Sequence, residues 1–146
     1  MSLTKTKQPF LALSKICLNN WHYIDQKVLS FNDGINFFTG HSGSGKSTVI
    51  DAMQIVLYAN TDGRGFFNKA AADDSDRNLI EYLRGMVAVG EKDEVTYLRN
   101  KNFSTTIVLE FTQTESDEKE CLGVVFDVDT ARNDTSRLFS VSYTHL

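Results

Sequence analysis

The segment from Gly40 to Ser47 carries the residue types that bind phosphate. Its sequence, Gly-His-Ser-Gly-Ser-Gly-Lys-Ser, matches the pattern G-x-x-x-x-G-K-[ST] at every fixed position. The glycines allow the backbone to curl, so that several N–H groups can point into one concavity. Lys46 offers a mobile positive charge to β- and γ-phosphates, Ser47 a hydroxyl to Mg²⁺, and Thr48 a hydroxyl to the α-phosphate. We therefore predict a nucleoside triphosphate site formed by Gly40, His41, Ser42, Gly43, Ser44, Gly45, Lys46, Ser47 and Thr48.

The elements on either side of this loop are those that a phosphate-binding loop needs. Ile35–Thr39 is apolar and is predicted to form a strand that enters the loop. After the loop, apolar residues recur at three- and four-residue spacing, which predicts a helix from about Lys46 to Tyr58 with its N-terminus at the phosphates. A loop that merely turns the chain would explain neither Lys46 nor Ser47. The residues on the predicted apolar face are Val49, Ile50, Met53, Val56 and Leu57.

Other segments predict a sheet around this unit. Ile16, Leu18 and Asn20 alternate with more polar neighbours, which is typical of a half-buried strand. A second strand is predicted at Lys27–Phe31, closed by Asn32-Asp33-Gly34, where an Asp-Gly pair accepts the positive φ of a tight turn.

The second half of the chain predicts one helix and a hairpin. Asp76–Arg84 has apolar residues at helical spacing, and Gly85 is placed to end the helix. The runs Thr105–Thr112 and Leu122–Val128 are rich in β-forming residues, and an acidic link joins them. We therefore expect them to pair as an antiparallel hairpin.

The composition is that of an ordinary globular chain. Of 146 residues, 15 are Lys or Arg and 19 are Asp or Glu, which gives a net charge of −4, and 41 % are hydrophobic. This excludes a disordered tail, a disulfide-rich mini-protein and a generally basic nucleic-acid coat. With neither a signal peptide nor a membrane-length apolar run in the sequence, we expect a cytoplasmic protein without a membrane partner.

Three stretches of the chain resemble the N-terminal half of an SMC-type (structural maintenance of chromosomes) ATPase head, of the same group as SbcC-type ATPases. They are the strand-like Leu13–Trp21 with its Asn-Trp ending, Phe37–Ser47, and Thr48–Met53 with its Asp-Ala pair. The residues Gly63–Ala70, Arg77 and Tyr82–Gly85 resemble a narrower branch, the condensin-like ATPase subunit of MksBEF and Wadjet plasmid-defence systems. The resemblance spans about Leu13 to Gly85.

The resemblance implies a specific chemistry. Such heads bind ATP with Mg²⁺ and enclose two nucleotides between two heads, and hydrolysis is coupled to DNA held by coiled coils. The implied roles are chromosome segregation, DNA repair or plasmid defence in a bacterial, nucleoid-associated protein. The implied partners are a C-terminal half-head, a second head, DNA and accessory subunits of a condensin-like complex.

The sequence lacks three features that a complete head of this family would have. The sequence has no Leu-Ser-Gly-Gly-like signature, no apolar strand ending in Asp-Glu and no sustained heptads. We therefore expect an α/β P-loop NTPase fold, the N-terminal lobe of an ABC/SMC-type head, with a mixed, incomplete sheet and a β-hairpin over residues 1–140. Residues 141–146 resemble an artificial run-on and are set aside. On this interpretation no catalytic residue lies in the fragment, which binds ATP without turnover.

Two other functions are compatible with a phosphate-binding loop. A complete small P-loop kinase or NTPase would use Asp127, at the end of Leu122–Asp127, as its Mg²⁺-binding acid; a polar residue on a hairpin strand is the structural alternative. A transporter-type ATPase would have a membrane protein as its partner.

The basic residues Arg64, Lys69 and Arg77 are candidates for contact with DNA or phosphate. Arg64 lies between Gly63 and Gly65, which would allow a close approach to a phosphate. Acidic residues are equally frequent in this region, so a solvated, salt-bridged face is the alternative.

Overall fold

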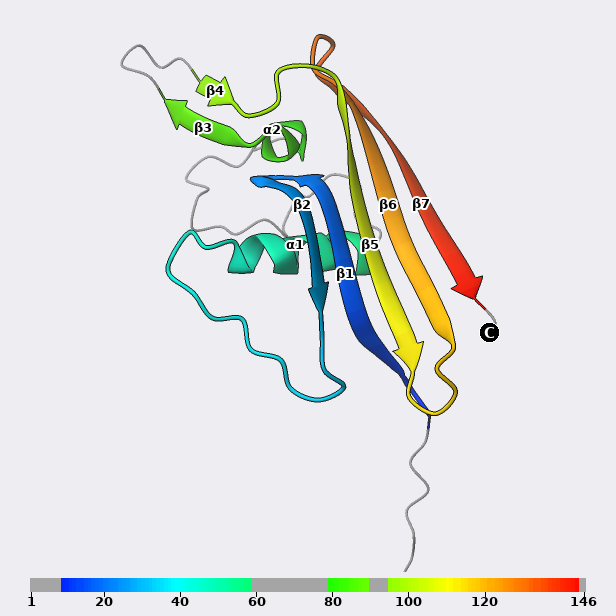
Figure 1. The fold of residues 1–146 in the computed structure, drawn as a ribbon. Coiled ribbons are helices and arrows are strands. Elements are labelled where there is room, and N and C mark those ends of the chain that lie inside the picture. Colours follow the sequence, from blue (N-terminus) through cyan, green and yellow to red (C-terminus); the bar gives the residue numbers. More distant parts are fainter. Residues whose placement is uncertain (1–8, 59–78, 90–94, 145–146) are drawn as a thin grey trace, which may run out of the picture.

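The computed structural model describes residues 9–58, 79–89 and 95–144. A five-stranded sheet is the main layer, and helix α1 runs across one of its faces (Figure 1). A short helix, α2, and a two-stranded sheet lie beside the turn that joins the first two strands. The elements in chain order are β1 (Leu11–Trp21), β2 (Ile24–Ser30), α1 (Lys46–Leu57), α2 (Leu79–Arg84), β3 (Met86–Val89), β4 (Val95–Tyr97), β5 (Phe103–Gln113), β6 (Lys119–Asp129) and β7 (Asp134–Thr144).

The strand order of the main sheet is β2-β1-β5-β6-β7, and every neighbouring pair is antiparallel. The predicted hairpin is confirmed, with Phe103 opposite Val128 and Thr112 opposite Lys119. No strand had been predicted for β7, which continues to Thr144 opposite Lys119, into the segment set aside from the sequence. The α/β class is confirmed.

The core lies between one face of this sheet and the two helices. Alternation along β1 buries Ile16 and Leu18, and a positive φ of 50° at Asn20 breaks the alternation so that Trp21 is also buried. Helix α1 contributes an inner face that follows the predicted periodicity in part, since Ile50 and Leu57 are exposed. The buried residues of α1 are Val49, Asp51, Ala52, Ile55 and Val56.

Helix α2 (Leu79–Arg84) is the first described element after residue 78. The predicted apolar residues Leu79, Ile80 and Leu83 are buried, as expected. Gly85 ends the helix with a φ of 69°, and its N–H donates to the carbonyls of Glu81 and Tyr82. Residues 76–78 of the predicted helix lie outside the described residues.

The predicted strand over Ile35–Thr39 is wrong, because this segment has no regular structure. A strand needs a neighbour for its backbone N–H and C=O groups, and none of the described strands pairs with it. Ile35 and Phe37 are 78 % and 82 % exposed. The turn before it also differs, since Gly34 has no positive φ. The Asn36 side chain holds this turn through the N–H and carbonyl of Asn32.

Candidate nucleotide-binding site

The phosphate-binding loop is curled by its glycines. Gly40, Gly43 and Gly45 have φ values of 153°, 80° and 91°, which favour glycine. A Cβ added to Gly40 would lie 2.5 Å from the Ser44 Oγ. The Ser44 N–H donates to the His41 carbonyl at 3.1 Å, which closes the loop on itself. The curvature therefore depends on the absence of a side chain at specific positions.

The ammonium of Lys46 lies across this loop. Its Nζ donates to the carbonyls of Gly40 at 2.5 Å and His41 at 2.8 Å, and to the Ser44 Oγ at 3.1 Å. All three acceptors belong to the loop and are neutral. Phosphate oxygens carry full negative charge and form stronger charge-assisted hydrogen bonds with an ammonium. The group is therefore placed where it could exchange these partners for phosphate.

Helix α1 begins at the loop with its N-terminus open to an anion. Gly45 is the N-cap residue, no side chain caps the helix, and its first turn holds no acidic residue. The first N–H groups of a helix have no intrahelical partner, and they attract negative charge. Ser47 is exposed, so its hydroxyl is accessible to a cation held by a nucleotide. Loop, lysine and hydroxyl together have the chemistry that could hold a nucleotide with its Mg²⁺, for which the Ser47 hydroxyl could serve as a ligand.

The same helix is anchored from the interior by two aromatic residues. The Trp21 Nε1 donates to the carbonyl of Thr48 at 2.8 Å, and the Tyr82 hydroxyl donates to the Asp51 Oδ2 at 3.0 Å. The Trp21 and Tyr82 rings lie 5.1 Å apart. Both groups therefore attach the first two turns of α1 to the ends of β1 and α2.

Burial sets the electrostatics of this anchor. It raises the pKa of the Asp51 carboxyl, and the hydrogen bond from Tyr82 acts in the opposite direction. The pKa of Tyr82 is raised by burial, by the negative charge of Asp51 and by the hydrogen bond to it, while a side-chain hydrogen bond with Thr48 lowers it. The phenol therefore stays protonated and remains a donor.

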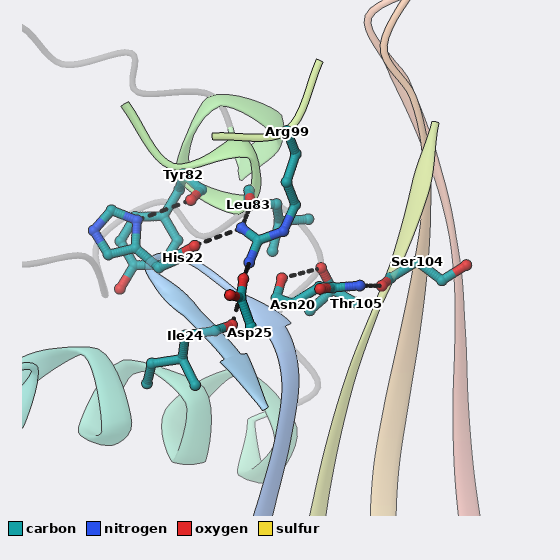
Figure 2. A network of polar contacts seen from close by, with 9 residues as sticks. All are labelled: Asn20, His22, Ile24, Asp25, Tyr82, Leu83, Arg99, Ser104 and Thr105. Carbon is teal, nitrogen blue, oxygen red and sulfur yellow. Dashed lines mark hydrogen bonds and ion pairs between the residues drawn. The ribbon is translucent and has the colours of Figure 1, made fainter. Parts of the chain in front are cut away.

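A second group of contacts holds the end of α2 against the β1–β2 turn (Figure 2). The His22 Nδ1 lies 2.9 Å from the Tyr82 carbonyl, and the two rings stack at 4.1 Å. The Arg99 guanidinium donates to the carbonyls of His22, Leu83 and Ile24 and to the carboxylate of Asp25. Burial lowers the pKa of Arg99, whereas the charge of Asp25 raises it. One side chain thus joins the turn after β1, the end of α2 and the start of β2.

Of the other candidate residues, Asp127 alone lies among those that the structure describes. Arg64, Lys69 and Arg77 lie outside the described residues. Asp127 is exposed and accepts a hydrogen bond from the Ser104 hydroxyl. Its neighbours Phe126 and Val128 are buried in the core that includes α1, so Asp127 points to the opposite face of the sheet. This geometry disfavours Asp127 as the Mg²⁺-binding acid.

Sequence reasoning missed Asp51, Tyr82 and Arg99 as parts of this site. Asp51 had a signal, because it is a charged residue within a helix of otherwise apolar character. Arg99 had none, since three of its partners are backbone carbonyls from distant segments. Among the residues that the structure describes, no three His, Cys, Asp or Glu side chains gather as metal ligands.

The part of the chain that contains the loop is similar to a known protein family. Residues 13–74 match the family model for the P-loop containing region of an AAA domain. A solved structure from work on the ATP-driven dimerisation and DNA-stimulated activation of SMC ATPases is 16 % identical, with a TM-score of 0.48. The match covers 92 % of this chain and 72 % of that one. No curated protein matches the chain.

The matched residues include most of β1 and all of β2, the loop and α1, so the α/β fold and the P-loop region predicted from the sequence are confirmed. Neither of the two described helices has the length and apolar character required to cross a membrane.

Proposed function

We propose that this chain is the ATP-binding N-terminal half of an SMC-like ATPase head that acts on DNA. The observation that carries the proposal is the Lys46 ammonium placed across a glycine-curled loop at the open N-terminus of α1. ATP with Mg²⁺ is the ligand for which this set of groups is suited. The nucleotide-binding residues are those of Gly40–Thr48, with Ser47 at the metal.

The unpaired segment over residues 35–39 supports a partner that completes the sheet. Its apolar side chains are exposed, and it leads directly into the loop. An apolar segment that pairs with none of the described strands is suited to pairing with a strand of another chain. A C-terminal half-head would supply that strand, together with the signature motif and the water-activating acid that the sequence lacks. Hydrolysis then requires this half and a second head.

The resemblance over Leu13–Gly85 supports the SMC-like branch, and with it DNA and accessory condensin-like subunits as partners. The narrower assignment to an MksBEF or Wadjet subunit is supported by residues 63–85, of which Arg64, Lys69 and Arg77 are the candidate contacts to DNA or phosphate. Bacterial chromosome segregation, DNA repair and plasmid defence share this head chemistry, and a cytoplasmic, nucleoid-associated location follows from any of them.

Nucleotide binding is tested by titration of the chain with a fluorescent ATP analogue in the presence of Mg²⁺. Lys46→Ala removes the point charge and little packing, so the affinity is expected to fall by about 100-fold or more. Lys15→Ala, an exposed lysine on β1, is the matched control and is expected to bind as the wild type does. Equal affinities of wild type and Lys46→Ala overturn the assignment of the loop.

The half-head is tested by its dependence on the missing half. The chain alone is expected to bind ATP without turnover, and addition of a C-terminal half-head encoded downstream is expected to give hydrolysis that DNA stimulates. A coding sequence that stops near residue 146 contradicts the proposal. A complete kinase would instead transfer phosphate to a small acceptor alone, and Asp127→Ala would abolish that transfer.

A further inference from the structure

Tyr82 joins α2 to the phosphate-loop helix by a side-chain hydrogen bond. Its hydroxyl donates to the Asp51 carboxylate at 3.0 Å, and its side chain also hydrogen bonds with Thr48. Its ring packs beside Trp21, whose Nε1 holds the Thr48 carbonyl. Asp51 is 6 % exposed and Tyr82 is 8 % exposed. A carboxylate this deeply buried is costly without its donor, so the hydrogen bond fixes the relative position of the two helices.

The two residues of α1 that Tyr82 contacts lie next to the nucleotide-binding groups. Thr48 directly follows Ser47, and Asp51 lies about one helical turn after Thr48. A helix moves as a unit over such a short span, since its backbone hydrogen bonds tie successive turns together. A displacement at Asp51 is therefore transmitted to the N-terminal N–H groups, Lys46 and Ser47, which must meet the phosphates together.

We infer that Tyr82 is a positioning residue for nucleotide binding, which couples α2 and the β1–β2 turn to the phosphate loop. The inference rests on the proposed ATP binding and adds a way in which that binding is regulated. A displacement of α2 moves the Tyr82 hydroxyl, which donates the hydrogen bond to Asp51. The His22 ring stacked on Tyr82 and the Arg99 guanidinium on the Leu83 carbonyl are the contacts that hold this donor in place.

The coupling must act in both directions, because linkage between two sites is reciprocal. The described part of helix α2, Leu79–Arg84, is too short to be stable without its neighbours. If α2 in its observed position increases the affinity for ATP, then bound ATP must in turn stabilise α2 in that position. The amides of α2 are therefore expected to exchange more slowly when ATP and Mg²⁺ are bound, although α2 is not part of the proposed nucleotide site at Gly40–Thr48.

The test compares three variants of the 146-residue chain by ATP titration, thermal unfolding and amide hydrogen exchange. Tyr82→Phe keeps the ring and removes the donor, and its ATP affinity is expected to fall at least about fivefold. Thr112→Val removes a hydroxyl that donates to the Ser14 hydroxyl, between β5 and β1, and is expected to bind ATP within about twofold of wild type. The double variant Asp51→Leu/Tyr82→Phe removes both polar partners, so it is expected to recover stability but not affinity.

The outcomes separate positioning from simple structural support. Weak ATP binding by the double variant, together with loss of ATP-dependent protection of α2 in Tyr82→Phe, supports the inference. ATP binding at wild-type affinity by Tyr82→Phe, or recovery of affinity by the double variant, overturns it and leaves the nucleotide site intact. If wild type and Lys46→Ala both fail to bind ATP, the proposed function and this inference fall together.

Discussion

The segment over residues 35–47 and the core under the main sheet use similar residue types in opposite ways. Phe37 and Phe126 are both phenylalanines in β-like sequence, yet the first is 82 % exposed and the second is fully buried. The core is held by packing and strand pairing between distant parts of the chain. Among the described residues, the 35–47 segment has short-range contacts, such as those of Asn36 with Asn32 and of Lys46 with Gly40. The difference indicates that stability resides in the core, whereas the segment carries the proposed ligand site.

This separation predicts that substitutions should affect one property or the other. Core residues define where α1 lies, whereas the loop residues are the proposed ligand contacts and contribute little packing. Helix α1 is the element shared by both regions, since its N-terminus borders the loop and its inner face is buried. Variants chosen from each region can test whether stability and ligand binding are separate properties of the chain.

The largest expected effect is that of Phe126→Ala. Removal of a fully buried ring leaves a cavity between β6 and the helices, so the free energy of unfolding is expected to fall by about 3–5 kcal/mol. Phe37→Ala removes the same side chain from an exposed site and is expected to change it by less than about 0.5 kcal/mol. Urea unfolding of both variants, followed by circular dichroism, measures the difference. Similar losses in the two variants would contradict the division into core and segment.

Arg99→Ala is expected to have the next largest effect on stability. The guanidinium is 9 % exposed and donates to three backbone carbonyls, which would lose a charged donor together. We expect the free energy of unfolding to fall by about 3 kcal/mol. The ion pair with Asp25 contributes little of this, because that carboxylate is 92 % exposed.

Two further variants identify the cause. Asp25→Ala is expected to change stability by less than about 1 kcal/mol, as is usual for an exposed pair. Arg99→Lys keeps the charge but cannot reach the three carbonyls with one planar fork, so it is expected to recover only part of the loss. Full recovery by lysine would show that charge, and not geometry, matters at this position.

Much of the fold could be predicted from local patterns. The three- and four-residue spacing in α1 and the two β-rich runs around an acidic link each specify an element within one stretch of chain. The strand predicted at Ile35–Thr39 is absent for a physical reason. An apolar run can form a strand only where a neighbouring strand accepts its backbone hydrogen bonds, and the residue pattern does not show whether such a neighbour exists. The hydrogen bonds of Arg99 could not be predicted either, because every residue has a backbone carbonyl and the sequence does not indicate which of them a side chain contacts.

The glycines of the loop offer a test of moderate size. Gly40→Ala places a Cβ 2.5 Å from the Ser44 Oγ and strains a φ of 153°, so the concavity must change shape. We expect the affinity for ATP with Mg²⁺ to fall about tenfold, because misplaced donors lose part of their charge-assisted hydrogen bonds. Gly34→Ala is the matched control, since a Cβ there meets no atom within 4 Å. Equal affinities of the two variants would show that the loop tolerates a side chain at Gly40.

The smallest expected effect concerns the pH dependence of stability that arises from Asp51. Burial raises the pKa of this carboxyl in the folded chain above its ordinary value of 3.8, so the folded state binds the proton more tightly than the unfolded state does. Its contribution to stability is therefore full below pH 3.8 and is lost as the pH rises through the folded pKa. Asp51→Asn removes this titration and keeps an acceptor for Tyr82. The difference in unfolding free energy between variant and wild type, measured by urea unfolding from pH 4 to pH 8, is expected to shift in favour of the variant as the pH rises. A difference that stays constant, or that shifts toward wild type, would mean that burial does not disfavour the charged form of Asp51. The surroundings of Asp51 in the core would then resemble the solvated loop more than the structure indicates.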